Sequence, residues 1–422
     1  MVVRALTVIA AVMLLAGCAS ATRSTTGQQA TKPPASVTVA DPRAAPRVTP
    51  ADRAALADGN ARFAGRLLAQ LARTHSTLAL SPFSISDALA MTYAGARGST
   101  AEQIATALDF GLPLPRLAAA FNAQAQSLAK ANGPGATLEV ANALFGQSGQ
   151  TFRPAFLAIL ARDYGAAMHT VDFASPDAVA QINGWVSDHT AGNIPQLLTP
   201  GDVSALTRLV LADAVYLDAK WLSPFQPQNT HPDVFHAPGS TIKVPTMHQN
   251  GTFAYRSGDG YQALELPYQG GRLALDILLP SQGGLQPLLA RIAASGPLPL
   301  LDGMAPEYVT VALPKFQLRT QFDLSGPLAA LGMPLAFDPQ RADLSGIAGA
   351  PGYLYIQHVI HEAYIDVDEA GTKAAAATGV VIGTTAVQLP PKIHFVADRP
   401  FIFVLRDKRT GAILFTGVTS HP

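Results

Sequence analysis

The order of the predicted helices and strands constrains the fold of this chain most strongly. Helical periodicity dominates from about residue 60 to residue 192, and Phe63, Leu67 and Leu71 mark the apolar face of the first helix. After about residue 205 the pattern changes to short runs rich in Val, Ile, Leu, Phe and Tyr, bounded by Gly, Pro and Asp. Helices and strands are therefore segregated along the chain, which predicts an α+β fold rather than a doubly wound parallel sheet.

Local signals place several of these elements. Ser81 before Pro82 is a typical helix N-cap, and Ser99 with Glu102 forms a capping-box sequence. The helix around Trp185 is expected to end at Gly192. Strands are expected at residues 206–217, 263–267, 273–279, 309–313, 365–367, 401–405 and 413–418. No internal repeat or second linker interrupts the body, so residues 52–422 are predicted to form a single domain.

Composition excludes two classes of protein. Of the 422 residues, 48% are apolar, which indicates a large buried core rather than a disordered chain. The 29 basic and 29 acidic residues cancel, and no run of like charges stands out. We therefore expect no nucleic-acid or polyanion partner.

We expect the first 51 residues to carry targeting signals and to lie outside the folded domain. Residues 1–17 have a basic start and an apolar stretch too short to span a bilayer, as in a signal peptide. Leu15-Ala16-Gly17-Cys18 resembles the bacterial lipobox, in which the cysteine is lipidated and becomes the new N-terminus. Cys18 is the only cysteine, so no internal disulfide can form. Residues 18–51, rich in Ala, Thr and Pro, predict a solvated tether. We expect an exported, lipid-anchored protein of the cell envelope, in an outer membrane facing the periplasm or on a cell surface.

The segment 369–391 has an unusual composition between two groups of strands. No charged residue occurs from Ala374 to Pro391, and small residues predominate. A flexible Ala/Gly loop is one interpretation. Small side chains also allow a segment to leave solvent and enter an existing sheet as an additional strand, in which Val380 and Ile382 would become buried.

The residues from Asp368 to Ala377 resemble the hinge of a serpin reactive loop. The hinge residues are Glu369, Gly371, Thr372, Ala374, Ala375, Ala376 and Ala377. Other serpin-like motifs follow in the family's order over more than 300 residues: Ser81-Pro82-Phe83-Ser84, Val210-Leu211-Ala212-Asp213, Lys220-Trp221, Glu265-Leu266-Pro267-Tyr268, Leu313-Pro314-Lys315-Phe316, His361-Glu362-Ala363 and Arg399-Pro400-Phe401. The resemblance implies a serpin fold with three β-sheets, eight or nine helices and an exposed reactive loop at 369–391.

The resemblance also implies a mechanism. A serpin is a suicide-substrate inhibitor and not an enzyme: a serine protease attacks the loop and forms its acyl-enzyme, and the cut loop then inserts into the main sheet. About 15 inserted residues at roughly 3.3 Å each would carry the protease about 50 Å. The implied partner is a target serine protease in a covalent complex. We expect a monomer that needs no cofactor.

The spacing from Glu369 places the scissile bond between Thr385 and Ala386, whereas counting back from Pro390 gives Val387. All three candidate residues are small or β-branched and uncharged. A trypsin-like specificity pocket with a buried aspartate would bind none of them well. An elastase-like or subtilisin-like target is therefore expected.

The family also assigns residues that control opening of the sheet. Ser84, Asp213 and His361 correspond to this gate, and Trp221 to packing where the loop enters. Asp213 stands where Asn is usual, and a carboxylate facing His361 is expected to favour a charged imidazole. Lys373 stands where inhibitory relatives usually carry Glu. Its side chain is expected to point outward after insertion.

Two rival functions remain. A non-inhibitory serpin would act as a surface binding protein. An exported serine hydrolase would use Ser240 and Lys243 as an SxxK motif, but Ser187-Asp188 precedes that motif, which is the wrong order. His358 and His361 lack the spacing of a helical zinc motif, so no metal site is expected.

Overall fold

A computed structural model describes residues 48–133, 135–372 and 393–422. Within these ranges the predicted α+β class is confirmed. The α-helices are α1 (Pro50–Leu71), α2 (Pro82–Gly95), α3 (Gly98–Ala107), α4 (Leu114–Ala129), α5 (Pro154–Ile159), α6 (Ala178–His189), α7 (Leu285–Ser295), α8 (Leu298–Leu301) and α9 (Ser325–Ala330). The strands are β1 (Leu78–Leu80), β2 (Ala136–Gln147), β3 (Met168–Val171), β4 (Leu209–Lys220), β5 (Thr230–Ala237), β6 (Ser240–Gly258), β7 (Tyr261–Pro267), β8 (Leu273–Pro280), β9 (Ala305–Pro314), β10 (Phe316–Asp323), β11 (Val359–Val367), β12 (Gly371–Thr372), β13 (Ile393–Val396), β14 (Phe401–Asp407) and β15 (Ile413–Thr419).

Side-chain capping marks the starts of α1 and α2, but not that of α3. Helix α1 begins at Pro50, two residues before the predicted domain boundary, because Thr49 and Asp52 form a reciprocal capping box. Helix α2 begins as predicted, since the Ser81 side chain accepts a hydrogen bond from the Ser84 N–H. The capping box predicted at Ser99 is wrong. Helix α3 already begins at Gly98 after Arg97, which makes no side-chain cap, so Ser99 lies inside the first turn.

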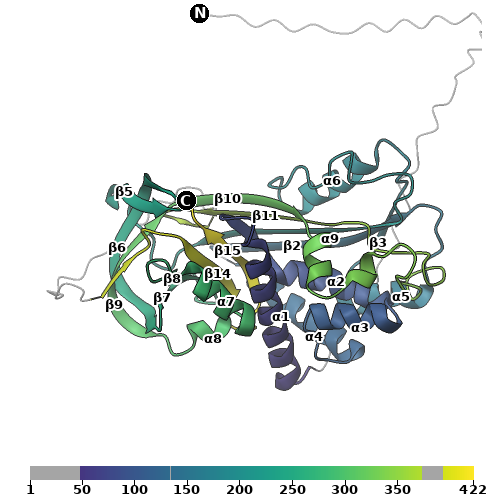
Figure 1. Cartoon of the computed structure of the whole chain (residues 1–422), viewed down its shortest axis with the longest axis horizontal. Helices are drawn as coiled ribbons and strands as arrows, with labels where there is room; N and C mark the ends of the chain where they lie inside the picture. The colour runs from purple at the N-terminus through teal and green to yellow at the C-terminus, as the bar shows by residue number, and fades with distance from the viewer. Residues whose placement is uncertain (1–47, 134, 373–392) are drawn as a thin grey trace, which may run out of the picture. The chain divides into compact units, whose positions relative to one another are not determined.

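The six-stranded sheet has the order β10-β11-β12-β4-β2-β3. Helix α6 lies over one of its faces, while α1, α2 and α4 lie on the side of the opposite face (Figure 1). Alternation along β4 explains both contacts: Val210, Ala212 and Ala214 pack in the cluster of α6, whereas Leu209 and Leu211 belong to the main core. The sheet is therefore buried on both faces near its centre.

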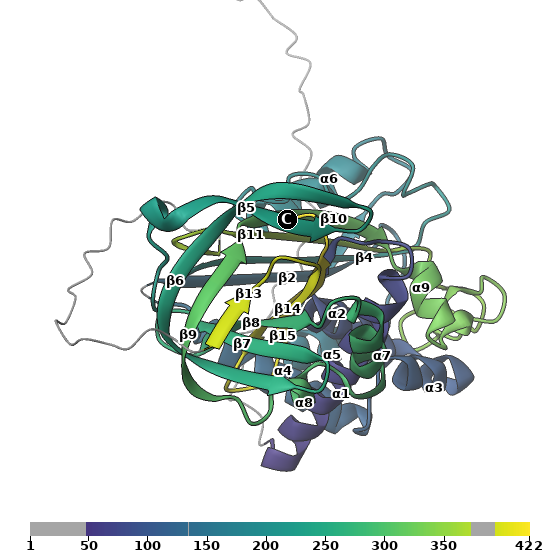
Figure 2. The ribbon, with the colours of Figure 1, turned by 60° about the vertical axis from the view of Figure 1, so that its left-hand side comes forward.

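The remaining strands form one nine-stranded ladder, β1-β15-β14-β8-β7-β6-β9-β13, with β5 attached to β6. Two of the three predicted sheets are continuous here, because the 19-residue strand β6 pairs with β5, β7 and β9. Strand β13, which follows residues 373–392, runs parallel to β9 (Figure 2). In the described part of the chain no helix is long and apolar enough to cross a membrane.

Candidate functional site: the hinge and the seam of the six-stranded sheet

The hinge enters the sheet as the two-residue strand β12. Gly371 pairs with Lys220 and Thr372 with Ala219 of β4, and Thr372 also pairs with Val367 of β11, all antiparallel. A Cβ atom at residue 371 would lie 2.0 Å from the carbonyl oxygen of Ala219. Only glycine allows this close approach of the two backbones.

Thr372 is already buried in this arrangement. The residue is 2% exposed, and its hydroxyl lies 2.5 Å from the hydroxyl of Tyr268. The Tyr268 ring stacks on Trp221 with 4.5 Å between centroids. The Trp221 indole N–H donates to the carbonyl of Asp368 at 2.8 Å. Trp221 thus lies where the hinge enters the sheet, and Tyr268 is a contact that sequence reasoning missed.

Glu369 links the base of the hinge to strand β5 and to the junction between β9 and β10. It accepts hydrogen bonds from Thr230 Oγ1 at 2.8 Å and from Lys315 Nζ at 2.7 Å. Burial acts to raise the pKa of Glu369, but the hydrogen bonds from Lys315 and Thr230 outweigh it and hold the pKa below its usual value. Local sequence does not reveal these contacts, because Thr230 and Lys315 are 139 and 54 residues away from Glu369 in the chain.

Beyond β12 the two neighbouring strands pair directly with each other. Residues Val359–Ala363 of β11 run parallel to Leu211–Val215 of β4. We call this ladder the seam. Strands β10 and β2, on its two sides, are antiparallel to their seam neighbours. Strand β12 therefore separates β4 from β11 at one end of the seam. A parallel ladder such as the seam is slightly less stable per residue than an antiparallel one.

A buried pair crosses the seam. His361 and Asp213 are register partners, and His361 Nδ1 lies 2.9 Å from Asp213 Oδ1. The Ser81 backbone N–H donates to His361 Nε2 at 3.0 Å. Nε2 must then be the acceptor nitrogen, and Nδ1 carries the proton donated to Asp213. This geometry corrects the expected charged imidazole: a neutral imidazole faces the carboxylate.

Ser84 is connected to the His361–Asp213 pair through Asn142. Its hydroxyl donates to Asn142 Oδ1 at 2.6 Å, and Asn142 Nδ2 donates to Asp87 Oδ2 at 2.9 Å. Asn142 is the cross-strand neighbour of Asp213. Burial raises the pKa of Asp87 to about 7, opposed by the Asn142 hydrogen bond and reinforced by the charge of Asp213. Asp87 and Asn142 carry no sequence signal, since only the β2–β4 register brings them to the gate.

Several predicted residues lie outside the described ranges. They are Cys18, Lys373, Ala374, Ala375, Ala376, Ala377, Thr385, Ala386 and Val387.

The family model "Serpin (serine protease inhibitor)" matches residues 58–422. The chain belongs to the serpin family. A serpin-like protein of Thermococcus kodakarensis is 40% identical, covering 85% of this chain and 84% of its own length. The leukocyte elastase inhibitors of Bos taurus and Homo sapiens are 39% and 37% identical, each covering 87% of this chain and 99% of the relative.

Solved serpin structures match the same body. The native state of the thermophilic serpin tengpin matches with a TM-score of 0.82 at 27% identity, over 92% of this chain and 99% of that one. Serpin48 of the insect Tenebrio molitor matches with a TM-score of 0.77 at 34% identity, over 87% and 98%. Thyroxine-binding globulin in complex with thyroxine matches with a TM-score of 0.76 at 27% identity, over 87% and 99%.

Proposed function

We propose that this serpin is an irreversible suicide-substrate inhibitor of serine proteases that traps the acyl-enzyme by loop insertion. One observation carries the proposal: β12 lies between β4 and β11 at one end of the seam, while the rest of the seam still pairs directly. Strand β12 is antiparallel to both β4 and β11, whereas these two strands are parallel to each other. Continuing β12 down the seam would replace one parallel ladder with two antiparallel ladders, which is a favourable exchange.

The register predicts where each inserted residue would lie. The offset between β11 and β4 is the same at Val367–Thr372–Ala219 as along the seam, so β12 can be extended without a shift. Because Thr372 faces the core, the alternate residues Ala374, Ala376, Thr378, Val380 and Ile382 would face it too. These side chains are small or apolar, as a filled core requires.

Insertion would break the pair across the seam. In this register Thr378 comes between His361 and Asp213, the two residues that now share a 2.9 Å hydrogen bond. The pair would therefore hold the sheet closed until the loop is cut. The Thr378 hydroxyl would offer both groups a replacement partner.

The same register accounts for Lys373, the departure from the inhibitory pattern. Lys373 would lie beside Asp366 of β11 and Asp218 of β4, on the face opposite to Thr372. Two carboxylates would then flank one ammonium group. A glutamate there would meet like charge, so Lys373 suits insertion in this chain.

The length of the inserted segment determines how far the trapped protease would be moved. Thr385 follows Thr372 by thirteen residues, which at about 3.3 Å each span about 43 Å. A protease acylated at this residue would be carried that far along the sheet. Deacylation needs its oxyanion hole in register, and an error near 1 Å already costs about a hundredfold in rate.

An elastase-like or subtilisin-like target is proposed from the uncharged candidates Thr385, Ala386 and Val387. The relatives described as leukocyte elastase inhibitors support this class. The similarity to thyroxine-binding globulin supports a second candidate, a non-inhibitory serpin that acts as a surface binding protein.

We further propose that the chain is bacterial and exported, that lipidated Cys18 anchors it to the cell envelope, and that it acts as a monomer. Cys18→Ser should abolish labelling by radioactive palmitate and release the protein from membranes.

The decisive experiment incubates the protein with pancreatic elastase, subtilisin and trypsin in turn. An inhibitor gives a covalent complex that survives SDS, with elastase or subtilisin preferred, and mass spectrometry of the released peptide locates the cut among Thr385, Ala386 and Val387. Two cleaved fragments without a complex, for every protease tested, would show the non-inhibitory serpin instead.

A further inference from the structure

Three metal-ligating side chains meet on the β5–β6 ladder. His231 and Asp233 lie two residues apart on β5, where they pair with Thr246 and Val244 of β6. Side chains alternate along a strand, and directly paired residues share a face. His248 of β6, two residues beyond Thr246, therefore faces the same side as His231 and Asp233.

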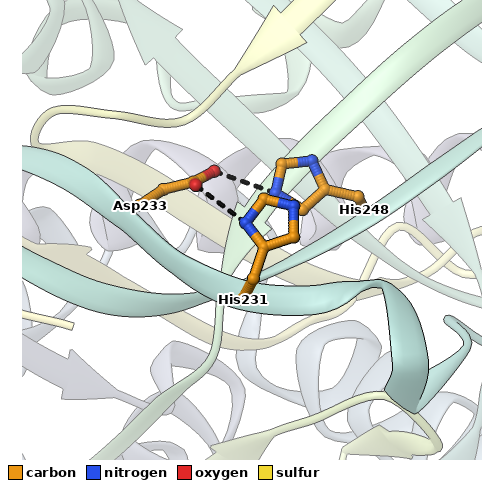
Figure 3. Close-up of side chains that lie close together, drawn as sticks. All are labelled: His231, Asp233 and His248. Carbon is orange, nitrogen blue, oxygen red and sulfur yellow. Dashed lines mark hydrogen bonds and ion pairs between the residues drawn. The ribbon is translucent and has the colours of Figure 1, made fainter.

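The three groups converge on one point. His231 Nδ1 lies 2.9 Å from Asp233 Oδ1, and His248 Nε2 lies 2.8 Å from Asp233 Oδ2. The two imidazole rings stack with 4.2 Å between centroids, both turned toward the carboxylate (Figure 3). The ligand atoms all lie within 4.8 Å of one another.

One of these atoms lacks a proper partner. His248 Nε2 is shielded from solvent, and its short contact with Asp233 does not have the geometry of a hydrogen bond. Buried polar atoms almost always have a partner, so this nitrogen calls for an explanation. A cation bound between the rings and the carboxylate would supply one.

We propose that His231, Asp233 and His248 form a binding site for a divalent zinc-type metal ion. Two imidazole nitrogens and one carboxylate oxygen suit zinc better than calcium or magnesium, which prefer oxygen ligands. Zinc–nitrogen bonds of about 2.0–2.1 Å require tetrahedral ligands about 3.3 Å apart, so the two rings, stacked at 18° from parallel, would have to tilt toward a common point to bind one ion. The fourth position is open to water, because the His231 side chain is 57% exposed.

A bound ion would fasten β5 to the rest of the sheet. Among the described residues β5 forms a ladder with β6 alone. The metal would add a side-chain link between the two strands at the end that carries Thr230, the partner of Glu369. Zinc is therefore expected to slow hydrogen exchange of the β5 amides and to raise the melting temperature by a few degrees at a large excess over Kd.

The test is a zinc titration of the full chain by calorimetry, with four proteins compared. The wild type should bind one zinc ion per chain. The variants His231→Gln and His248→Gln should each bind at least tenfold more weakly. The control His236→Gln changes an exposed histidine of the same strand on its other face, and should bind as the wild type does.

Cobalt provides a second readout that does not depend on folding energy. Co²⁺ should give the intense visible absorption of a tetrahedral site in the wild type and in His236→Gln, and lose it in His231→Gln, whose exposed position makes misfolding an improbable cause. Zinc binding that is equal in all four proteins, or absent from the wild type, would overturn the proposal.

Discussion

At the scale of single residues, the hinge differs from its expected behaviour in one respect. The family resemblance makes Thr372 part of the hinge of the inserting loop, yet it is already 2% exposed and in contact with Tyr268 while β4 and β11 still pair along the seam. In the proposed mechanism, only the residues that follow Thr372 would then insert. Substitutions at residue 372 therefore act on the starting state as well as on the trapped state.

Thr372→Arg should convert the inhibitor into a substrate and also destabilise the uncut protein. An unpaired charge in this buried position costs several kcal/mol, so residue 372 would leave the sheet. The loop should still be cut at the normal rate, while covalent complex disappears from SDS gels and the melting temperature of uncut protein falls. Full complex formation by Thr372→Arg would contradict the insertion mechanism.

Lys373→Glu should weaken trapping although it restores the usual family residue. The inserted glutamate would lie beside Asp218 and Asp366, and like charges across a sheet repel. The number of inhibitor molecules consumed per trapped protease should rise severalfold. The double variant Lys373→Glu/Asp366→Lys should restore the wild-type value, and an unchanged value in Lys373→Glu would refute the proposed register.

At the scale of elements, the seam between β4 and β11 is the contact that the proposed insertion would have to open. The side-chain hydrogen bond across the seam between His361 and Asp213 is buried, and removing Asp213 leaves the His361 Nδ1–H without this acceptor. An unsatisfied buried donor costs about 1–3 kcal/mol. Strand separation is then easier.

Asp213→Ala should therefore accelerate heat-induced polymerisation about fivefold to a hundredfold, as followed by native gels. Asp213→Asn is the matched control, because its amide oxygen can still accept the hydrogen bond from His361, and its rate should stay near that of the wild type. Equal rates for Asp213→Ala and the wild type would mean that the pair does not hold the seam.

The network beside the seam predicts a pH dependence of stability. Burial raises the pKa of Asp87 from 3.8 to about 7. A carboxyl whose folded pKa is raised contributes stability below its unfolded pKa that is lost as pH rises through the folded value. The free energy of unfolding should fall between about pH 4 and pH 7, by roughly 4 kcal/mol at 1.36 kcal/mol per pKa unit.

Asp87→Asn keeps an oxygen acceptor for Asn142 and should flatten this part of the curve. Urea midpoints from pH 4.5 to pH 8 would measure it, with exposed Asp58→Asn as the control. The idea fails if the wild type and Asp87→Asn lose stability in parallel over that range.

At the scale of the whole molecule, five residue pairs join β11 to β4 directly, which in the proposed mechanism is the state before loop insertion. Cutting the loop should raise the melting temperature sharply, because the added strand forms two antiparallel ladders and buries Val380 and Ile382. Calorimetry before and after limited proteolysis measures this rise. An unchanged melting temperature would favour the non-inhibitory serpin.

The sequence by itself determined the features that depend on neighbouring residues. The Ser81 cap, the segregation of helices and strands, the glycine and threonine of the hinge, and the absence of charge after Lys373 could all be recognised in short windows, because capping, periodicity and composition act locally. Even here a local pattern could mislead, since Ser99 matched a capping box that the start of α3 does not use.

Only the tertiary structure decided which distant groups meet. His361 and Asp213 are 148 residues apart, and Glu369 and Thr230 are 139 apart. Their contacts and the meeting of His231, Asp233 and His248 on the β5–β6 ladder all depend on strand register. Register is set by packing of the whole core and by long-range pairing, and a shift of one residue would turn every side chain to the other face.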